Sequence, residues 1–245
     1  MNTNRDRYEN PSVVDFYANL KSLEVAERFL FDKYLKRGMK ILDIGVGAGR
    51  TTPYLSAIAS LYVGVENSYH MLDVCRRRFP RLSFVRADAS DLGMFVDDSF
   101  DAVVFSFNGI DYIETDLSRK NFWAHCNRIT TVDGCLIFSC HNAGYLCPSP
   151  SATQSTTHAL WRWTRSLIHS RDHIWRCVRD GIFLKKEGYI LEQTHGELRT
   201  HYTAPKRVKN ELSRAGFRVV DVLPQSFPKM SGRHSTPWYH YACIK

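Results

Sequence analysis

The stretch Ile41-Leu42-Asp43-Ile44-Gly45-Val46-Gly47-Ala48-Gly49-Arg50 decides the fold of this chain. It begins with a short, mostly apolar run typical of a buried strand, and glycines at alternate positions follow it directly. A glycine-rich turn between a strand and a helix lets a ligand approach the backbone closely. The spacing is GxGxG, because Arg50 stands where the GxGxxG fingerprint of nicotinamide and flavin sites needs its last glycine.

Around this stretch, apolar runs rich in β-branched and aromatic residues alternate with segments of helical spacing. We expect strands at Lys40–Ile44, Leu61–Val65, Leu82–Val85, Asp101–Phe107 and Cys135–Cys140. We expect helices at Arg50–Ala59, Ser68–Phe79 and Asp116–Ile129. Such alternation is typical of a parallel sheet with right-handed crossovers, so the pattern predicts a doubly wound α/β fold.

The two ends of the chain complete the expected domain. Helical spacing of apolar residues predicts one helix over Val13–Leu35, packed on the sheet or over its ligand crevice. A helix is expected at Pro205–Arg214 and strands at Phe217–Leu223 and Trp238–Ile244. The connection between these strands is too short for a parallel crossover, so they should form an antiparallel hairpin at the sheet edge.

We therefore expect a single domain with four parts. These are an N-terminal cap helix in residues 1–36, a core in 37–140, an irregular insertion in 141–204, and a closing helix and strands in 205–245.

The composition bounds the class of protein. The first twenty residues contain Arg5, Arg7 and Asp15 but no apolar run, so they do not form a secretory signal. No segment approaches the roughly 20 apolar residues that span a bilayer. The seven cysteines include no CxxC pair, which argues against a disulfide framework and a zinc site. We expect a soluble, cytoplasmic protein with reduced thiols and no bound metal.

The formal net charge of +8 is unevenly placed along the chain. Residues 1–140 hold 17 Lys and Arg against 18 Asp and Glu, whereas residues 141–245 hold 16 against 7. This excess favours an acidic substrate or nucleic acid as a partner, and a solvated basic face explains it equally well.

Four segments, in order, resemble the class I S-adenosylmethionine-dependent methyltransferases. DIGVGAG, at 43–49, is similar to the loop that cradles the methionine part of the cofactor, and VGVENSYHML, at 63–72, to the second strand with its ribose-binding acid, Glu66. RADASDL, at 86–92, is similar to the segment whose acid, here Asp88, meets the adenine amino group. DDSFDAVVFS, at 97–106, resembles the fourth strand and its lead-in.

The resemblance implies a seven-stranded, mostly parallel Rossmann-like sheet with an antiparallel last strand. It also implies S-adenosylmethionine as the cofactor and S-adenosylhomocysteine as the product, without a metal. The cofactor-binding residues that it implies are Asp43, Gly45, Gly47, Gly49, Glu66, Asn67, Asp88, Ala89, Phe107 and Asn108. Asn67 departs from the family, which commonly places an apolar residue there against the adenine.

The residue types suit these roles. One carboxylate, Glu66, accepts hydrogen bonds from two vicinal ribose hydroxyls. The Asp88 carboxylate and the Ala89 amide match the amino donor and the ring nitrogen acceptor of adenine. Asp43 should help to set the loop geometry.

The chemistry expected is in-line displacement at a sulfonium, in which alignment and exclusion of water lower the barrier. A base is needed only where the acceptor loses a proton. His141 is the first candidate, because it titrates near neutrality and follows the fifth strand into the crevice. The alternative is a histidine that only caps the strand. Tyr112 and Asp111 are further candidates.

In small-molecule members of the family, the insertion after the fifth strand builds a lid over the substrate. In this chain, the alternation at His173–Leu184 and Tyr189–Tyr202 predicts an antiparallel flap. Its tryptophans and arginines, Trp161, Trp163, Trp175, Arg162, Arg165, Arg171, Arg176 and Arg179, could clamp an anionic or sugar-like acceptor or form a helix packed on the sheet.

The leading hypothesis is methylation of an oxygen or nitrogen in a small metabolite or a sugar-bearing intermediate. An RNA or protein methyltransferase is the alternative that the basic C-terminal half favours. Against it, Asn108 is followed by Gly109-Ile110-Asp111 and not by the Pro-Pro-Tyr of nucleic-acid amino-methylating enzymes. A non-catalytic, cofactor-binding interaction module is a third possibility.

Overall fold

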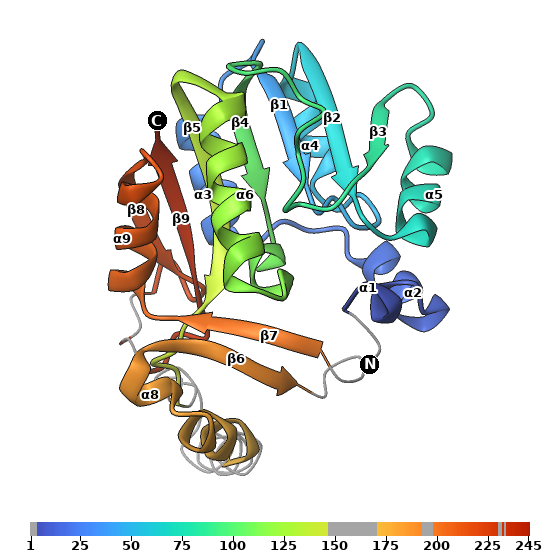
Figure 1. Ribbon diagram of the computed structural model, residues 1–245. Helices are drawn as coiled ribbons and strands as arrows, with labels where there is room; N and C mark the ends of the chain where they lie inside the picture. Colours follow the sequence, from blue (N-terminus) through green and yellow to red (C-terminus); the bar gives the residue numbers. More distant parts are fainter. Residues whose placement is uncertain (1–3, 147–170, 193–197, 230–231, 233) are drawn as a thin grey trace.

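The computed structural model describes residues 4–146, 171–192, 198–229, 232 and 234–245. Seven strands form one sheet in the order β3-β2-β1-β4-β5-β9-β8 (Figure 1). They are β1 (Lys40–Ile44), β2 (Leu61–Glu66), β3 (Ser83–Arg86), β4 (Phe100–Phe105), β5 (Thr130–His141), β8 (Arg218–Pro224) and β9 (Trp238–Ile244). The pairs among β1 to β5 are parallel, and β9 is antiparallel to both β5 and β8. The expected sheet and its edge hairpin are confirmed.

Both faces of the sheet are covered, which explains the nearly continuous apolar strands. Successive residues of β1 enter different cores: Ile41 packs with the helices on one face and Leu42 with those on the other. The first face is covered by α3 (Val25–Tyr34), α4 (Thr52–Ile58) and α5 (Tyr69–Arg78). The second is covered by α6 (Asp116–Ile129) and α9 (Pro205–Arg214), which lie in front of the sheet in Figure 1.

The single N-terminal helix predicted over Val13–Leu35 is wrong. The structure has α1 (Asn4–Tyr8), α2 (Pro11–Asn19) and α3, and residues 20–24 between the last two are not helical. The backbone N–H of Glu24 donates to Glu27 Oε2 at 3.1 Å, so Glu27 reaches back to start a new helix. The helix α3 packs on the sheet, whereas α2 packs on α5 through Val13 and Val14.

The insertion also differs from expectation in its first part. Residues 171–179 are helical and α8 (Ile182–Lys185) follows, so the strand predicted at His173–Leu184 is wrong. Cys177 and Ile182 are buried and form a small core with Ile190 and Tyr202 of the hairpin that follows. Trp161, Trp163, Arg162 and Arg165 lie outside the described residues. Trp175 is 62% exposed.

An antiparallel hairpin does form, but within the second predicted segment alone. It consists of β6 (Glu187–Glu192) and β7 (Leu198–Thr203). Thr203 bridges to Asn142 just after β5, and the hairpin crosses the molecule at the carboxyl ends of the parallel strands (Figure 1). It therefore lies at the edge of the sheet where open α/β folds bind their ligands.

Among the described residues, no helix is long and apolar enough to cross a membrane.

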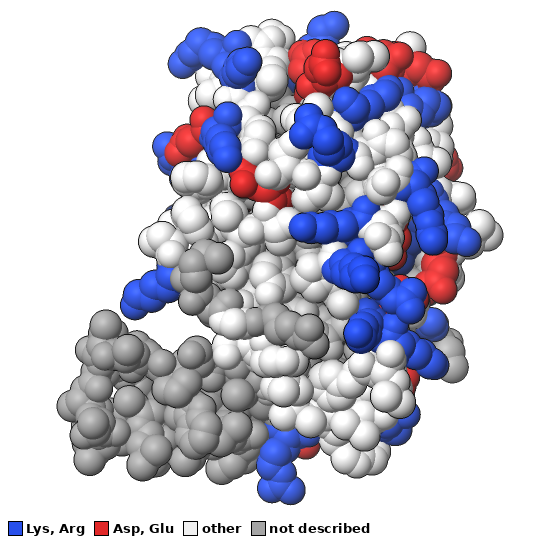
Figure 2. Space-filling view, turned by 90° about the vertical axis from the view of Figure 1, so that its left-hand side faces the viewer, with Lys and Arg blue, Asp and Glu red and all other residues white. Residues whose placement is uncertain are grey.

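Figure 2 faces the side on which α9 and β8 lie in Figure 1. Lys and Arg side chains gather there in a band along the right of the view, with few Asp and Glu among them. Part of the basic excess of residues 141–245 thus lies on this side, since α9 alone carries Lys206, Arg207, Lys209 and Arg214.

Candidate functional site

A cavity of about 570 Å³ opens at the carboxyl ends of the central parallel strands. We call it the cofactor cavity. Its lining includes the turn after β1, the end of β2, the segment after β3 and the end of β4. This is the crevice in which open α/β sheets bind their ligands, because the loops diverge there to either side of the sheet.

The turn after β1 requires glycine for two reasons. Gly45 and Gly47 have φ angles of 60° and 57°, in the left-handed region that favours glycine. A Cβ atom on Gly45 would also lie 2.5 Å from Cε2 of Phe105. Both glycines line the cofactor cavity, so the backbone itself forms part of its wall.

Glu66 joins this turn to the end of β2. Its Oε2 accepts a hydrogen bond from the Gly47 N–H at 2.9 Å, and its Oε1 accepts from the N–H groups of Asn67 and Ser68 at 2.8 and 2.9 Å. Burial raises the pKa of Glu66, and these backbone donors oppose the rise. A carboxylate has about four acceptor positions, so the three bonds leave room for a ligand hydroxyl.

Asp88, Asn67 and Ala89 line the same cavity. The Asn67 side-chain amide donates to Asp88 Oδ2 at 3.0 Å, and the Ser90 N–H and hydroxyl donate to Oδ1 at 2.8 and 2.6 Å. Asn67 therefore orients Asp88 from the position where the resemblance leads one to expect an apolar residue.

Three of the expected cofactor residues do not line the cavity, and two of these, Asp43 and Gly49, lie behind the turn after β1. Asp43 is buried and accepts hydrogen bonds from the hydroxyls of Thr51, at 2.6 Å, and Tyr62, at 2.8 Å. Burial raises the pKa of Asp43 to about 6. Gly49 has φ 88°, and a Cβ there would lie 2.6 Å from Cε2 of Phe79. Both residues shape the turn from beneath.

Three aromatic residues close the cavity on the side of the N-terminal helices and the segment after β4. The ring centroid of Tyr8, on α1, lies 5.6 Å from that of Tyr112 and 5.9 Å from that of Tyr17, on α2. We call Tyr8, Tyr17 and Tyr112 the tyrosine wall. Burial raises the pKa of Tyr8 and of Tyr112, so both hydroxyls stay protonated. Tyr8 and Tyr17 were missed in the sequence, because no motif marks them.

Arg50, the residue that excluded a GxGxxG site, also lines the cavity. Its guanidinium binds both carboxylate oxygens of Glu27, at 2.6 and 2.7 Å, and lies 4.9 Å from the ring centroid of Phe107. Burial raises the pKa of Glu27, but Arg50 outweighs burial and the net shift is downward. The site therefore contains a buried, charged pair that the sequence motif did not reveal.

Of the three catalytic candidates, Tyr112 lines the cavity, and His141 and Asp111 do not. His141 Nδ1 lies 2.9 Å from Oδ2 of the fully buried Asp111, which also accepts from the His141 backbone N–H at 2.6 Å. The Nε2 atom lies 3.4 Å from Nδ2 of Asn108. Burial lowers the pKa of His141, but Asp111 outweighs it and leaves that pKa above its ordinary value.

The segment after β4 is held in a fixed shape. Phe107 and Asn108 have φ angles of 54° and 60°, and the Asn108 N–H donates to Ser139 Oγ at 2.8 Å. A short 3₁₀ helix, η1 (Gly109–Tyr112), follows directly. Phe107 lines the cofactor cavity, whereas the Asn108 side chain is buried beside His141.

Known proteins resemble this chain in both sequence and structure. Residues 41–134 match the family described as a methyltransferase domain. A demethylmenaquinone methyltransferase of Clavibacter sepedonicus is 44% identical over 80 residues, which are 31% of this chain and 32% of that protein. The chain therefore matches about one third of the length of that curated relative.

Solved structures match over nearly the whole fold. A crystal structure of an S-adenosylmethionine-dependent methyltransferase from Mesorhizobium loti has a TM-score of 0.63 at 18% identity, covering 90% of this chain and 98% of that one. One from Methanosarcina mazei also has a TM-score of 0.63 at 18% identity, covering 88% and 96%. The chain thus has the fold of these methyltransferase structures, and its residues 41–134 match a methyltransferase domain.

Proposed function

We propose that the protein transfers the methyl group of S-adenosylmethionine to an oxygen or nitrogen of a small metabolite or sugar-bearing intermediate. The observation that carries this proposal is the division of the cofactor cavity into two parts. One part is the glycine turn with Glu66 and Asp88, and the other is the tyrosine wall. A cavity of about 570 Å³ has the size usual for small-molecule sites.

In this proposal the polar part binds the cofactor. Glu66 accepts a hydrogen bond from a ribose hydroxyl, Asp88 and the Ala89 amide meet the adenine, and the turn at Gly45 and Gly47 lies along the methionine part. The methyl group then faces the tyrosine wall. During transfer the methyl–sulfur bond breaks as the methyl–acceptor bond forms, and S-adenosylhomocysteine leaves.

The tyrosine wall excludes water from the transfer, and Tyr112 contacts the acceptor. His141 and Asp111 lie behind Tyr112, and both ring nitrogens of His141 have side-chain neighbours. We therefore propose His141 and Asp111 as positioning residues, which tie η1 and Tyr112 to the end of β5. A nitrogen acceptor is an uncharged amine when it attacks, and a proton lost by the acceptor passes to solvent before the acceptor enters the cavity or after the methylated product leaves it.

A turnover assay that detects S-adenosylhomocysteine tests the proposal. The chain is incubated with S-adenosylmethionine and with panels of metabolites, sugars and RNA. Turnover on a small molecule, lowered at least tenfold by Tyr112→Ala, is the expected result. Cofactor binding without turnover on any acceptor would favour the interaction module.

Methylation of RNA or protein is a second candidate, because residues 141–245 carry a basic excess. Turnover confined to RNA or protein substrates would replace the first proposal with this one.

A further inference from the structure

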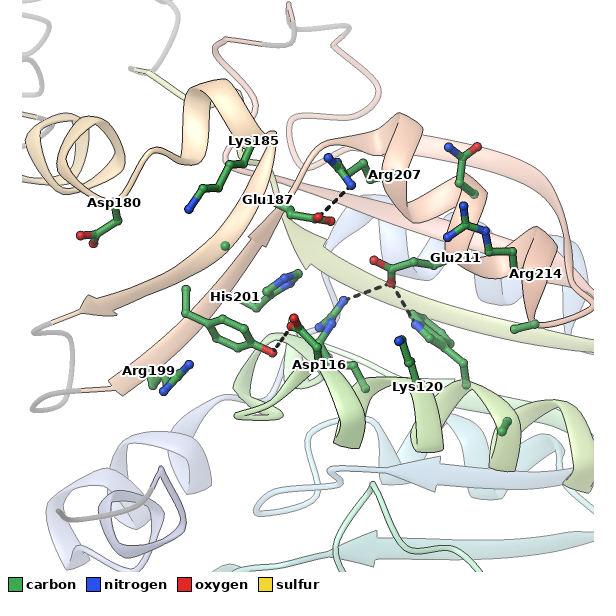
Figure 3. A pocket seen from close by; sticks show the side chains of 17 residues that line it. Asp116, Lys120, Asp180, Lys185, Glu187, Arg199, His201, Arg207, Glu211 and Arg214 are labelled. Atoms are coloured by element: carbon green, nitrogen blue, oxygen red, sulfur yellow. Dashed lines mark hydrogen bonds and ion pairs between the residues drawn. The ribbon is translucent and has the colours of Figure 1, made fainter.

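A second, larger cavity of about 980 Å³ lies between α6, α9 and the β6–β7 hairpin (Figure 3). We call it the charged cavity. Six basic side chains line it: Arg119, Lys120, Lys185, Arg199, Arg207 and Arg214. Four acidic side chains line it as well, so its lining has an excess of two positive charges. The residues lining it are distinct from those lining the cofactor cavity.

Every carboxylate of the charged cavity already has a partner. The pairs are Glu187 with Arg207 at 2.7 Å, Glu211 with the indole N–H of Trp123 at 3.0 Å, Asp116 with the hydroxyl of Tyr189 at 3.2 Å, and Asp180 with Arg179 at 2.8 Å. Arg119 lies between Glu211, at 3.6 Å, and Asp111, at 3.7 Å. The acidic groups and two of the six basic ones are thus engaged with each other or with neighbours.

Four basic side chains remain without an ion pair among the described residues. They are Lys120 on α6, Lys185 on α8, Arg199 on β7 and Arg214 on α9. No dashed line reaches any of them in Figure 3, where Lys120 extends from α6 and Lys185 extends from α8 on the side on which Asp180 lies. The Arg199 guanidinium lies over the Tyr189 ring at 4.5 Å, which leaves its N–H groups available. Four elements thus each contribute to one cavity a cation that makes no ion pair with the described residues.

We propose that the charged cavity binds the phosphate or diphosphate group of a small molecule. Ammonium groups bind phosphate as point charges, and guanidinium groups bind it through paired N–H donors. The excess of two charges suits one compact dianion. A long phosphate backbone suits the cavity less well, because Asp116, Asp180 and Glu187 line it too.

The location gives this site a connection to the proposed methyl transfer. The first turn of α6 separates the two cavities: Thr115 and Ser118 line the cofactor cavity, and Asp116 and Arg119 line the charged one. The phosphate group belongs either to the acceptor or to a separate effector, and the site's chemistry is the same for both. The binding proposal does not rest on the proposed function.

Calorimetric titration of inorganic pyrophosphate into the full chain tests the site directly. S-adenosylhomocysteine is present in excess, so that the cofactor cavity is blocked. We expect one saturable site at low ionic strength, and affinity at least about tenfold weaker in the double variant Lys120→Ala and Lys185→Ala, because two charge-assisted contacts are lost. Lys120 and Lys185 are both exposed, so the double variant should fold, and an unchanged melting temperature will show that it does.

The matched control is Lys209→Ala, which removes an exposed charge from α9 outside the cavity. It should bind pyrophosphate as the unchanged chain does. No saturable binding, or equal weakening in the control, would overturn the proposal. The proposal would also be overturned if a single-stranded RNA bound more tightly than pyrophosphate and if the double variant and the control weakened its binding equally.

A kinetic measurement separates the two sources of the phosphate. Pyrophosphate that competes with the acceptor in the turnover assay would assign the site to the acceptor itself. Inhibition or activation without competition would assign it to an effector. Because pyrophosphate binding is read without turnover, a failure of the methyl-transfer proposal would leave the binding result intact.

Discussion

The Glu66 carboxylate stabilises the turn after β1 and the end of β2 through hydrogen bonds, and it is also the group proposed to bind the ribose of the cofactor. Its carboxylate accepts from three backbone N–H groups, one in the turn after β1 and two in the residues just before α5. Substitution of Glu66 should therefore lower both the stability of the fold and the affinity for the cofactor. Substitution of a carboxylate that contacts only a ligand should lower the affinity alone.

We expect Glu66→Ala to weaken S-adenosylhomocysteine binding by about 1.5–3 kcal/mol, the scale of a hydrogen bond to a charged group. The melting temperature without ligand should also fall, because three N–H groups lose their acceptor. Calorimetry and thermal melting measure the two effects. Asp88→Ala is the comparison: this residue is exposed, so its loss should weaken binding with little change in stability. An unchanged dissociation constant in Glu66→Ala would remove this residue from the cofactor site.

His141 distinguishes positioning from proton transfer. If it positions η1, His141→Ala should lower turnover by about tenfold at every pH, with cofactor affinity nearly intact. If it is the base, the loss should be about 10²–10⁴-fold. Because Asp111 raises the pKa of His141, a base there would also lose activity as pH falls through a value above the ordinary one. A pH profile of turnover for both chains decides, and an acidic limb that disappears in His141→Ala would contradict the positioning role.

Asp43 gives the stability of the chain a predictable pH dependence. Burial raises its folded-state pKa to about 6 from 3.8, so the folded protein binds a proton that the unfolded chain has released. Stability from this group is therefore greatest at low pH and falls as pH rises from about 4 to about 6, by about 3 kcal/mol for a shift of about two units. Asp43→Asn should lack this slope. Melting temperatures of both chains from pH 4 to 7 measure it, and parallel curves would refute the assignment.

At the scale of elements, a small contact joins the N-terminal cover to the core. The Glu9 carboxylate, just after α1, accepts from the backbone N–H groups of Tyr69 and His70, at 2.8 and 3.1 Å, and from the Ser68 hydroxyl at 3.1 Å. Burial raises the pKa of Glu9, but these donors outweigh it and the net shift is downward. One carboxylate thus caps α5 and holds the helices that carry Tyr8 and Tyr17.

We expect Glu9→Ala to loosen α1 and α2 from α5. The dissociation of S-adenosylhomocysteine should become several-fold faster, and limited proteolysis should cut residues 4–19 sooner. Stopped-flow displacement and mass spectrometry of the fragments provide the readouts. Asp15→Ala, an exposed residue on α2, is the matched control and should behave as the unchanged chain. Equal behaviour of the two variants would show that Glu9 does not secure the cover.

The elements also show why sequence predicts some parts and not others. The helix α6 has the predicted bounds because its start is local: Thr115 accepts from the Ser118 N–H at 3.1 Å. The strands β1 and β9 also have the predicted bounds, because their apolar runs are short and bounded by turns. The N-terminal helix was predicted too long, since helical spacing continues across residues 20–24. The prediction relied on the spacing of apolar residues and overlooked Glu27, which caps the start of α3.

The site divides in the same way. The glycine turn, Glu66 and Asp88 were predicted from motifs at the ends of three successive strands, and all three line the cofactor cavity. Of the tyrosine wall, Tyr112 was predicted but Tyr8 and Tyr17 were not, because only tertiary packing brings them to this side of the cavity. No sequence pattern connects residues so far apart.

For the whole molecule, the distribution of charge separates the two acceptor classes. The band of Lys and Arg in Figure 2 lies toward α9 and β8, at the far end of the sheet from β1 and β2. The charged residues that line the cofactor cavity are Arg5, Arg50, Glu66, Asp88 and Glu114, so its lining has one more acidic than basic group. An RNA whose phosphates bind the basic band would have to place its target base in the cofactor cavity, where no excess of positive charge attracts the neighbouring phosphates.

We therefore expect only weak, non-specific RNA binding, with dissociation constants of about 10⁻⁴ to 10⁻⁶ M near physiological salt. It should weaken steeply as salt rises from roughly 50 to 200 mM, because each phosphate contact releases counterions. Fluorescence anisotropy with several unrelated single-stranded RNAs measures the affinity, its salt slope and its sequence dependence. Equal affinities and no S-adenosylhomocysteine formed are the expected result, since attraction to the band would then be separate from methyl transfer. A single preferred sequence that is also methylated would reverse the choice in favour of an RNA methyltransferase.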